Sequence, residues 1–154
     1  MMLFGEYDHQ VDAKNRIRIP SKFKQELKNG YYFVMGNAKC ISIYPAENME
    51  KFVKQFEGIS DLDIEAQEEL ANIFGSVFPG DEDGQGRVVL PKTLREYAGI
   101  SKDVVSIGMV DRIDIYSKDE RERIKSKKTH QERIQFLKGS IKYIIRSTKW
   151  IADS

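Results

Sequence analysis

Residues 12–20 read Asp-Ala-Lys-Asn-Arg-Ile-Arg-Ile-Pro, and residues 83–91 read Asp-Gly-Gln-Gly-Arg-Val-Val-Leu-Pro. Both stretches contain an aspartate, three variable residues, an arginine, an apolar residue, a variable residue, a second apolar residue and a proline. The two stretches are offset by 71 residues. A shared pattern of this length indicates that one structural module occurs twice in the chain.

The similarity extends outward from these stretches along both halves of the chain. Three further pairs of segments align in the same order: residues 21–27 with 92–98, 33–36 with 105–108, and 40–44 with 112–116. The last two pairs have an offset of 72 residues, so a single-residue insertion lies between the blocks. Four ordered blocks establish an internal duplication.

The sequence pattern of each copy predicts a strand, a turn, a second strand, a short helix and a hairpin. In the first copy these are a strand at 5–10, a polar turn at 12–15, a strand at 16–19, a helix at 21–28, and hairpin strands at 31–35 and 40–44. Alternate residues of a strand face opposite sides, so Ile17 and Ile19 face one side. Arg16 and Arg18 face the other side. Pro20 ends the strand and suits the first turn of the helix.

The second copy predicts the same elements, with Gly99 after its helix and a hairpin from about 103 to 116. Between the copies, a helix is expected over about 47–57. The pattern Ser60-Asp-Leu-Asp63 then predicts a capping box that opens an amphipathic linking helix. The apolar face of that helix is predicted to contain Leu62, Ala66, Ile73, Phe74 and Val77.

The chain after residue 118 is predicted to be helical to its end. An apolar stripe recurs there at helical spacing, formed by Ile134, Leu137, Ile141, Ile144 and Ile145, with Trp150 and Ile151 beyond it. Residues 121–149 hold ten Lys and Arg but only two Glu. We expect the stripe of this basic tail to pack on a neighbouring subunit. Nonspecific contact with DNA and binding to a membrane surface stay open as alternatives.

Composition narrows the class of protein. A length of 154 residues suits one compact domain or two very small ones. The formal net charge is +1, yet residues 1–80 carry a net charge of −3 and residues 81–154 a net charge of +4. Basic residues are therefore clustered, which favours approach to phosphates. The single cysteine excludes an intrachain disulfide, and no apolar run reaches membrane-spanning length, so we expect a soluble, cytoplasmic protein.

Residues that carry enzyme chemistry do not form a recognisable pattern. His9 and His130 are far apart and lack metal-ligand spacing, and Cys40 is expected to be a small buried apolar group. The acidic stretch 81–83 is expected to be a solvated turn rather than a metal site. Catalytic-triad, nucleotide-loop and metalloprotease motifs do not occur. The sequence therefore predicts a protein that is not an enzyme and uses no metal, cofactor or small-molecule substrate.

The two Asp-x-x-x-Arg turns have two interpretations. In the first, Asp12 and Asp83 accept hydrogen bonds from the turn and pair with the arginine, so the motif only fixes the hairpin. In the second, the turn also presents basic side chains to a ligand; in the first copy these are Lys14, Arg16, Arg18 and Lys22. The planar guanidinium group binds a phosphate or the O6/N7 edge of guanine with two hydrogen bonds. Duplication favours the second interpretation, because two modules hold two basic edges in a fixed relation.

Together with further motifs, these turns resemble the MraZ family of bacterial regulators, which are encoded at the start of the division and cell-wall gene cluster. The resemblance covers Gly5 to about Tyr116 and is carried by Gly5-Glu-Tyr7, Asp12-Ala-Lys-Asn-Arg16, Ile19-Pro20 with Phe23, Cys40-Ile-Ser-Ile-Tyr44-Pro45, Asp83-Gly-Gln-Gly-Arg87, Leu94-Arg-Glu-Tyr-Ala-Gly99 and Ile107-Gly108. Asn15 stands where the family usually has glycine, and asparagine tolerates the left-handed conformation better than most residues.

The resemblance implies an α+β fold, mainly β with short helices, in which two AbrB-like swapped-hairpin β-barrel halves form a pseudo-dimer within one chain. The expected division is a first repeat at 1–55, a linking helix at 56–76, a second repeat at 77–118 and a basic amphipathic helical tail at 119–154. The resemblance also implies a nucleoid-associated homo-oligomeric ring that binds double-stranded DNA at repeats in its own promoter as a repressor. Arg16 and Arg87 are the implied DNA contacts.

Two other functions compete with this expectation. An antitoxin-like module of the AbrB fold would bind a toxin through its tail, although such antitoxins usually carry one copy of the fold. An assembly protein would bind another protein, with only incidental DNA contact. If the chain binds DNA, we expect Arg16 to contribute more affinity than Arg87, because the turn of the first copy is richer in Lys and Arg.

Overall fold

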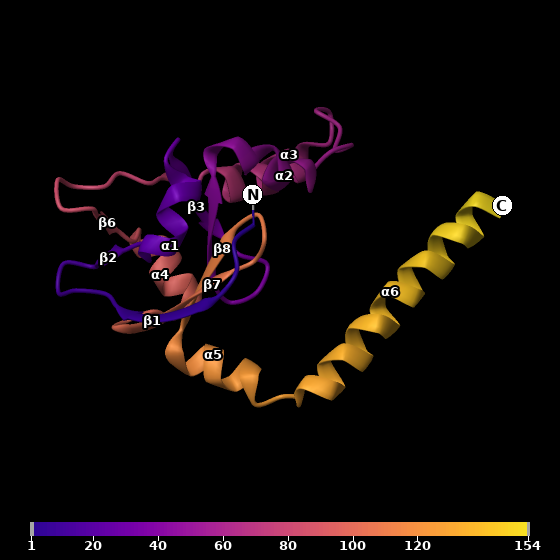
Figure 1. The fold of residues 1–154 in the computed structure, drawn as a ribbon. Helices are drawn as coiled ribbons and strands as arrows, with labels where there is room; N and C mark the ends of the chain where they lie inside the picture. The colour runs from indigo at the N-terminus through magenta and orange to yellow at the C-terminus, as the bar shows by residue number, and fades with distance from the viewer. Residues whose placement is uncertain (1, 154) are drawn as a thin grey trace. The chain divides into compact units, whose positions relative to one another are not determined.

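The computed structural model describes the backbone of residues 2–153 and the side chains of residues 2–141. The chain forms two compact units, Met1–Glu120 and Arg121–Ser154. The strands are β1 (Glu6–Gln10), β2 (Arg16–Arg18), β3 (Tyr31–Met35), β4 (Ile41–Pro45), β5 (Phe78–Pro79), β6 (Arg87–Val89), β7 (Asp103–Gly108) and β8 (Ile113–Ser117). The helices, of which the two η elements are short 3-10 helices, are α1 (Ser21–Lys24), η1 (Gln25–Leu27), η2 (Ala46–Asn48), α2 (Met49–Lys54), α3 (Ile64–Phe74), α4 (Lys92–Ala98), α5 (Lys118–Lys125) and α6 (His130–Asp153) (Figure 1).

The two copies interleave in one six-stranded antiparallel sheet, whose order is β1-β7-β8-β4-β3-β5. Strands β1–β4 belong to the first copy and β5–β8 to the second. If each strand is exchanged for its counterpart, the same order is read backwards, so an approximate twofold axis passes between β4 and β8. The outer strands are exchanged between the copies, because β1 pairs with β7 and β5 pairs with β3. The duplicated α+β fold is confirmed.

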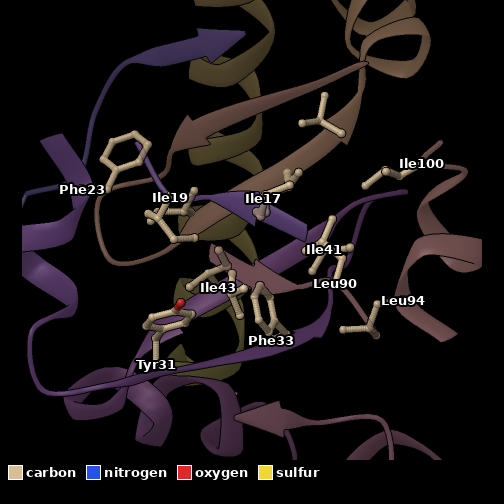
Figure 2. Packing of buried hydrophobic residues seen from close by; sticks show 14 of the residues in the cluster. Ile17, Ile19, Phe23, Tyr31, Phe33, Ile41, Ile43, Leu90, Leu94 and Ile100 are labelled. Atoms are coloured by element: carbon tan, nitrogen blue, oxygen red, sulfur yellow. The ribbon is translucent and has the colours of Figure 1, made fainter. Parts of the chain in front are cut away.

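One hydrophobic core is shared by both copies. Ile17 of β2 pairs with Val88 of β6, and each is only 2% exposed. Further core side chains come from both halves of the chain, among them Ile19, Phe23, Phe33, Ile41, Ile43, Leu90, Leu94 and Ile100 (Figure 2). The inward positions that alternation predicts for residues 16–19 are thus buried. Each copy supplies only part of the sheet over this core, so the core depends on both.

Two unlike residues meet at the twofold axis. Ser42 and Asp114 occupy equivalent positions in the two copies and pair with each other across β4 and β8. Both are 3% exposed, and the Ser42 hydroxyl donates a 2.6 Å hydrogen bond to Oδ1 of Asp114. Arg112 donates from Nε to the same oxygen at 3.1 Å. The carboxylate is therefore buried with charge and hydrogen-bond partners, as a buried charge requires.

The linking helix begins later than the sequence predicts. Its N-cap is Asp63, whose Oδ1 accepts a 3.1 Å hydrogen bond from the backbone N–H of Ala66. Ser60 instead shapes the preceding turn, where its hydroxyl accepts from the N–H of Leu62. The predicted capping box at Ser60 is wrong, because an aspartate three residues later is an equally good cap and lies nearer the apolar repeat. Leu62 and Val77 consequently fall outside α3.

α3 packs on the preceding segment through Phe74, the last residue of the helix. The ring of Phe74 lies 6.4 Å from that of Phe52 and 5.6 Å from that of Phe56, with both pairs edge to face. Phe52 also belongs to a small buried cluster with Val34 and Tyr44 of the sheet. This second cluster fastens the segment between the copies to the β3–β4 hairpin.

The tail contains two helices rather than one continuous helix. Residues 126–129 separate α5 from α6, and Thr129 opens α6 with a reciprocal cap. The N–H of Thr129 donates to the carboxylate of Glu132 at 3.0 Å, and the N–H of Glu132 donates to the Thr129 hydroxyl at 3.3 Å. Ile134, Leu137 and Ile141 of the predicted stripe are exposed. The remaining predicted members, Ile144, Ile145, Trp150 and Ile151, lie outside the described side chains.

The single cysteine of the chain lies in the interior of the first unit. Cys40 is buried as predicted, at 1% exposure, and burial raises the pKa of its thiol to about 11. Across the part of the chain that the structure describes, a helix with the length and apolar character of a membrane span is absent. The same residues hold no group of three His, Cys, Asp or Glu side chains placed to bind a metal ion.

Ser42→Asp is expected to lower the free energy of unfolding by about 3–5 kcal/mol, because a second carboxylate would face Asp114 in a buried position. The matched variant Ser42→Ala removes only the hydroxyl and is expected to cost about 1.5–3 kcal/mol. Urea unfolding measures both values. Equal stability of the two variants would contradict the role given to the unlike pair.

Candidate nucleic-acid interface

The two Asp-x-x-x-Arg turns have the same hydrogen-bond pattern. Oδ1 of Asp12 accepts the backbone N–H groups of Lys14 and Arg16, each at 2.9 Å, and Oδ2 accepts Nε of Arg16 at 2.8 Å. In the second copy, Oδ1 of Asp83 accepts the N–H groups of Gln85 and Arg87 at 2.9 and 3.0 Å. Oδ2 of Asp83 accepts Nε of Arg87 at 2.8 Å. Each aspartate therefore shapes its turn and fixes its arginine at once.

A left-handed residue closes each turn. Asn15 has φ 62° and Gly86 has φ 75°, and their N–H groups donate to the carbonyl oxygens of Asp12 and Asp83, both at 3.0 Å. Asparagine adopts this conformation at lower cost than most side chains. The first turn thus keeps its shape without the glycine of the second.

The strands that follow the turns form a two-stranded antiparallel ribbon, β2 with β6. The register pairs Arg16 with Val89, Ile17 with Val88, and Arg18 with Arg87. Because Ile17 and Val88 enter the core, alternation directs the other four side chains outward. The turns that carry Asp12 and Asp83 project from the same side of the first unit (Figure 1). Three arginines consequently share one surface.

A hollow of about 430 Å³ lies at this surface, lined by His9, Gln10, Asp12, Arg16, Ile17, Arg18 and Arg87. It brings together three of the five basic residues predicted to contact DNA. Lys14 is exposed on the first turn and does not line the hollow. Lys22 lies on α1, with its Nζ 5.9 Å from the centre of the Tyr7 ring.

The carboxyl groups of Asp12 and Asp83 are held in their ionised forms. Hydrogen bonds from the backbone N–H of Arg16 and Lys14 and from the Arg16 guanidinium lower the pKa of Asp12. The backbone N–H of Arg87, followed by that of Gln85 and the Arg87 side chain, lowers the pKa of Asp83 to about 2. Nη1 of Arg16 also lies 3.8 Å from Oδ2 of Asp83, which links the two turns. The aspartates hold the arginines through Nε, and a guanidinium has four further N–H donors.

His9 and Gln10 of β1 line the hollow although the sequence assigned them no role. Nε2 of His9 lies 2.6 Å from the Ser106 hydroxyl of β7, and Gln10 donates to Asp103 at 3.0 Å. Burial lowers the pKa of His9, against a smaller opposing effect of Asp8, so the neutral ring is favoured. The sequence indicated only that His9 and Gln10 lie in the strand before the first turn. Their place at the hollow depends on the pairing of β1 with the other copy.

Acid unfolding tests the turn geometry. The pKa of folded Asp83, about 2, lies below its ordinary value of 3.8, so its stabilising effect is complete above about pH 4 and is lost as the pH falls toward 2. Asp83→Asn is expected to reduce the loss of stability over this window and to lower stability at neutral pH. The exposed Asp61→Asn is the matched control and should retain the wild-type pH dependence. Identical pH profiles for wild type and Asp83→Asn, measured by urea unfolding from pH 2 to 7, would contradict this role.

The sequence of the chain matches a known protein family. The model of the family described as "MraZ protein, putative antitoxin-like" matches residues 2–71 and 79–136. A "Transcriptional regulator MraZ" of Clostridium tetani is 36% identical over 133 residues, which cover 86% of this chain and 94% of that protein. The protein of the same name from Syntrophomonas wolfei is 40% identical over 118 residues, covering 75% of this chain and 81% of the relative. The chain belongs to the MraZ family, as its motifs predict.

Proposed function

We propose that this chain is a sequence-specific DNA-binding transcription regulator, which acts as a repressor at repeats in the promoter of its own division and cell-wall gene cluster. The observation that carries the proposal is the β2–β6 ribbon, on which Arg16, Arg18 and Arg87 share one surface beside a hollow. The relatives named as transcriptional regulators support the same function.

The ribbon has the shape and chemistry that duplex DNA requires. A two-stranded β-ribbon fits the major groove, where each base pair presents a distinct set of donors, acceptors and methyl groups. Asp12 and Asp83 fix Arg16 and Arg87 through Nε, so these side chains lose little conformational entropy on binding. Their Nη groups then bind guanine edges or phosphates. Lys14, exposed on the turn, and Lys22 on α1 add phosphate contacts at the rim.

Assembly of several chains supplies the affinity that one ribbon lacks. A single ribbon makes few phosphate contacts, and its binding at physiological salt is weak. A ring of identical chains presents the ribbon repeatedly, so tandem promoter sites raise the avidity without a new type of contact. In this arrangement the repeats at 1–55 and 77–118 hold the ribbon, residues 56–76 link them, and the tail at 119–154 joins neighbouring subunits. Ile134, Leu137 and Ile141 supply its apolar contacts.

The function has no catalytic step and needs no cofactor, metal, membrane or small-molecule substrate. The protein acts in the cytoplasm on the nucleoid. An antitoxin-like or assembly role would use a protein partner instead, and the DNA titration below distinguishes it from regulation. The presence of both copies in one chain favours regulation, because the ribbon is complete without a partner chain.

Titration of the protein with its own upstream DNA and with a scrambled duplex, over a series of salt concentrations, tests the proposal. Wild type is expected to prefer the upstream sequence. Arg16→Ala should lose about 10- to 100-fold in affinity for that sequence, and Arg87→Ala somewhat less. Arg16→Lys keeps the charge but not the planar fork, so it should keep salt-dependent binding and lose the preference.

Lys39→Ala is the control, since Lys39 is exposed on the β3–β4 loop and does not line the hollow. Its affinity should match that of wild type within about twofold. Equal wild-type affinity for both duplexes would overturn sequence-specific regulation and favour a protein-binding role.

The tail has a separate test. Leu137→Asp, or truncation after Ser126, is expected to lower the number of chains per oligomer, which light scattering gives as the ratio of oligomer mass to chain mass. The first variant places a charge on the exposed apolar face of α6 and the second removes that face, so both weaken its packing. Glu132→Asp, a conservative change within the cap of α6, should leave the mass unchanged. An unchanged number of chains with a shallower salt dependence of DNA binding would instead assign the tail to DNA contact.

A further inference from the structure

The outward face of the β2–β6 ribbon departs from the twofold symmetry of the fold. Arg16 and Arg87 are counterparts, but the counterpart of Arg18 is Val89. In the register, Arg18 lies opposite Arg87, and Arg16 lies opposite Val89. One half of the ribbon therefore presents two facing arginines, whereas the other half presents an arginine facing an isopropyl group.

Packing in the first unit does not account for the valine. Its neighbours in the chain, Val88 and Leu90, are 2% and 0% exposed and fill the core, while Val89 is 54% exposed. The position tolerates a large polar side chain, because Arg18 occupies the equivalent place in the other copy. Val89 is thus an exposed apolar group on the surface that carries the arginines.

We propose that Val89 contacts the 5-methyl group of a thymine in the major groove, so that the two halves of the ribbon read unlike base edges. This inference rests on the proposed function and deepens it. The thymine methyl is the apolar group that the major groove displays, and small apolar side chains recognise it. The arginines of the same face suit guanine edges and phosphates.

The register limits where that thymine lies. Side chains that face each other across an antiparallel pair have Cβ atoms about 4.5–5.5 Å apart. Bases along one DNA strand are spaced by about 3.4 Å. The thymine contacted by Val89 therefore lies within about two base pairs of the group contacted by Arg16.

An unlike pair of halves also gives the ribbon a direction on DNA. A symmetric ribbon would bind its site equally well in both orientations, as symmetric dimers bind palindromes. With Val89 in one half, a single orientation places the valine on thymine. Neighbouring chains of a ring then need sites that follow one another head to tail.

Duplexes from the region upstream of the gene for this chain, each with one thymine replaced by deoxyuridine, provide the test, because uracil lacks only the 5-methyl group. Wild type is expected to lose affinity about fourfold at one such position, the value of burying one methyl group. Val89→Ala should bind the modified and unmodified duplexes equally. Val53→Ala removes a valine of similar exposure on α2 and should keep the wild-type sensitivity.

Val89→Arg is a second variant. It is expected to fold, because an arginine, Arg18, occupies the equivalent position in the other copy. It should also lose the sensitivity to deoxyuridine, while its salt dependence becomes steeper. The inference is overturned if no single replacement weakens wild type, or if Val89→Ala and Val89→Arg keep the sensitivity. Failure of the proposed function has a different signature, which is equal wild-type affinity for upstream and scrambled DNA.

Discussion

The fold depends on the pairing of each outer strand with the opposite copy. β1 completes the sheet of the second copy and β5 completes that of the first, so neither copy covers the shared core alone. The β2–β6 ribbon exists only because this exchange carries both turns to the same place. Stability and the candidate interface therefore have a common origin, since a loss of pairing between the copies would expose the core and separate the arginines.

In the turns before β2 and β6, the same two carboxylates shape the backbone and hold the arginines. Asp12 and Asp83 accept the backbone N–H groups that define the turns and hold the guanidinium groups by Nε. A carboxylate beside a DNA surface would repel phosphates if its charge were free. Here each carboxylate is paired with its own arginine through Nε, which offsets its charge. The Nη groups of the arginines are the donors that the proposed DNA contact would use.

Local features of the fold could be predicted from the residue pattern, whereas the exchange of strands between the copies was expected only from the family resemblance. Alternation identified Ile17 and Ile19 as core residues, and the aligned motifs identified the turns and the left-handed position at Asn15. The exchange of β1 and β5 has no local signal, because two similar copies offer two similar partner strands. The position of His9 at the hollow follows from that exchange, and the place of Val89 opposite Arg16 follows from the register of β2 with β6, so both became visible only in three dimensions. Competition between two good caps, Ser60 and Asp63, explains the misplaced start of the linking helix.

The unlike pair at the axis has a consequence for how such a chain evolves. A homodimer encoded by a single-copy gene carries the same residue on both sides of its axis, so a change there occurs twice and a buried Asp would meet another Asp. Fusion of two copies removes that restriction, because each half can then change by itself, and Ser42 with Asp114 is such an unlike pair. Once the halves have diverged in this way, two second copies no longer substitute for the native pair, because two buried carboxylates would face each other. At this position the two halves have become complementary instead of interchangeable.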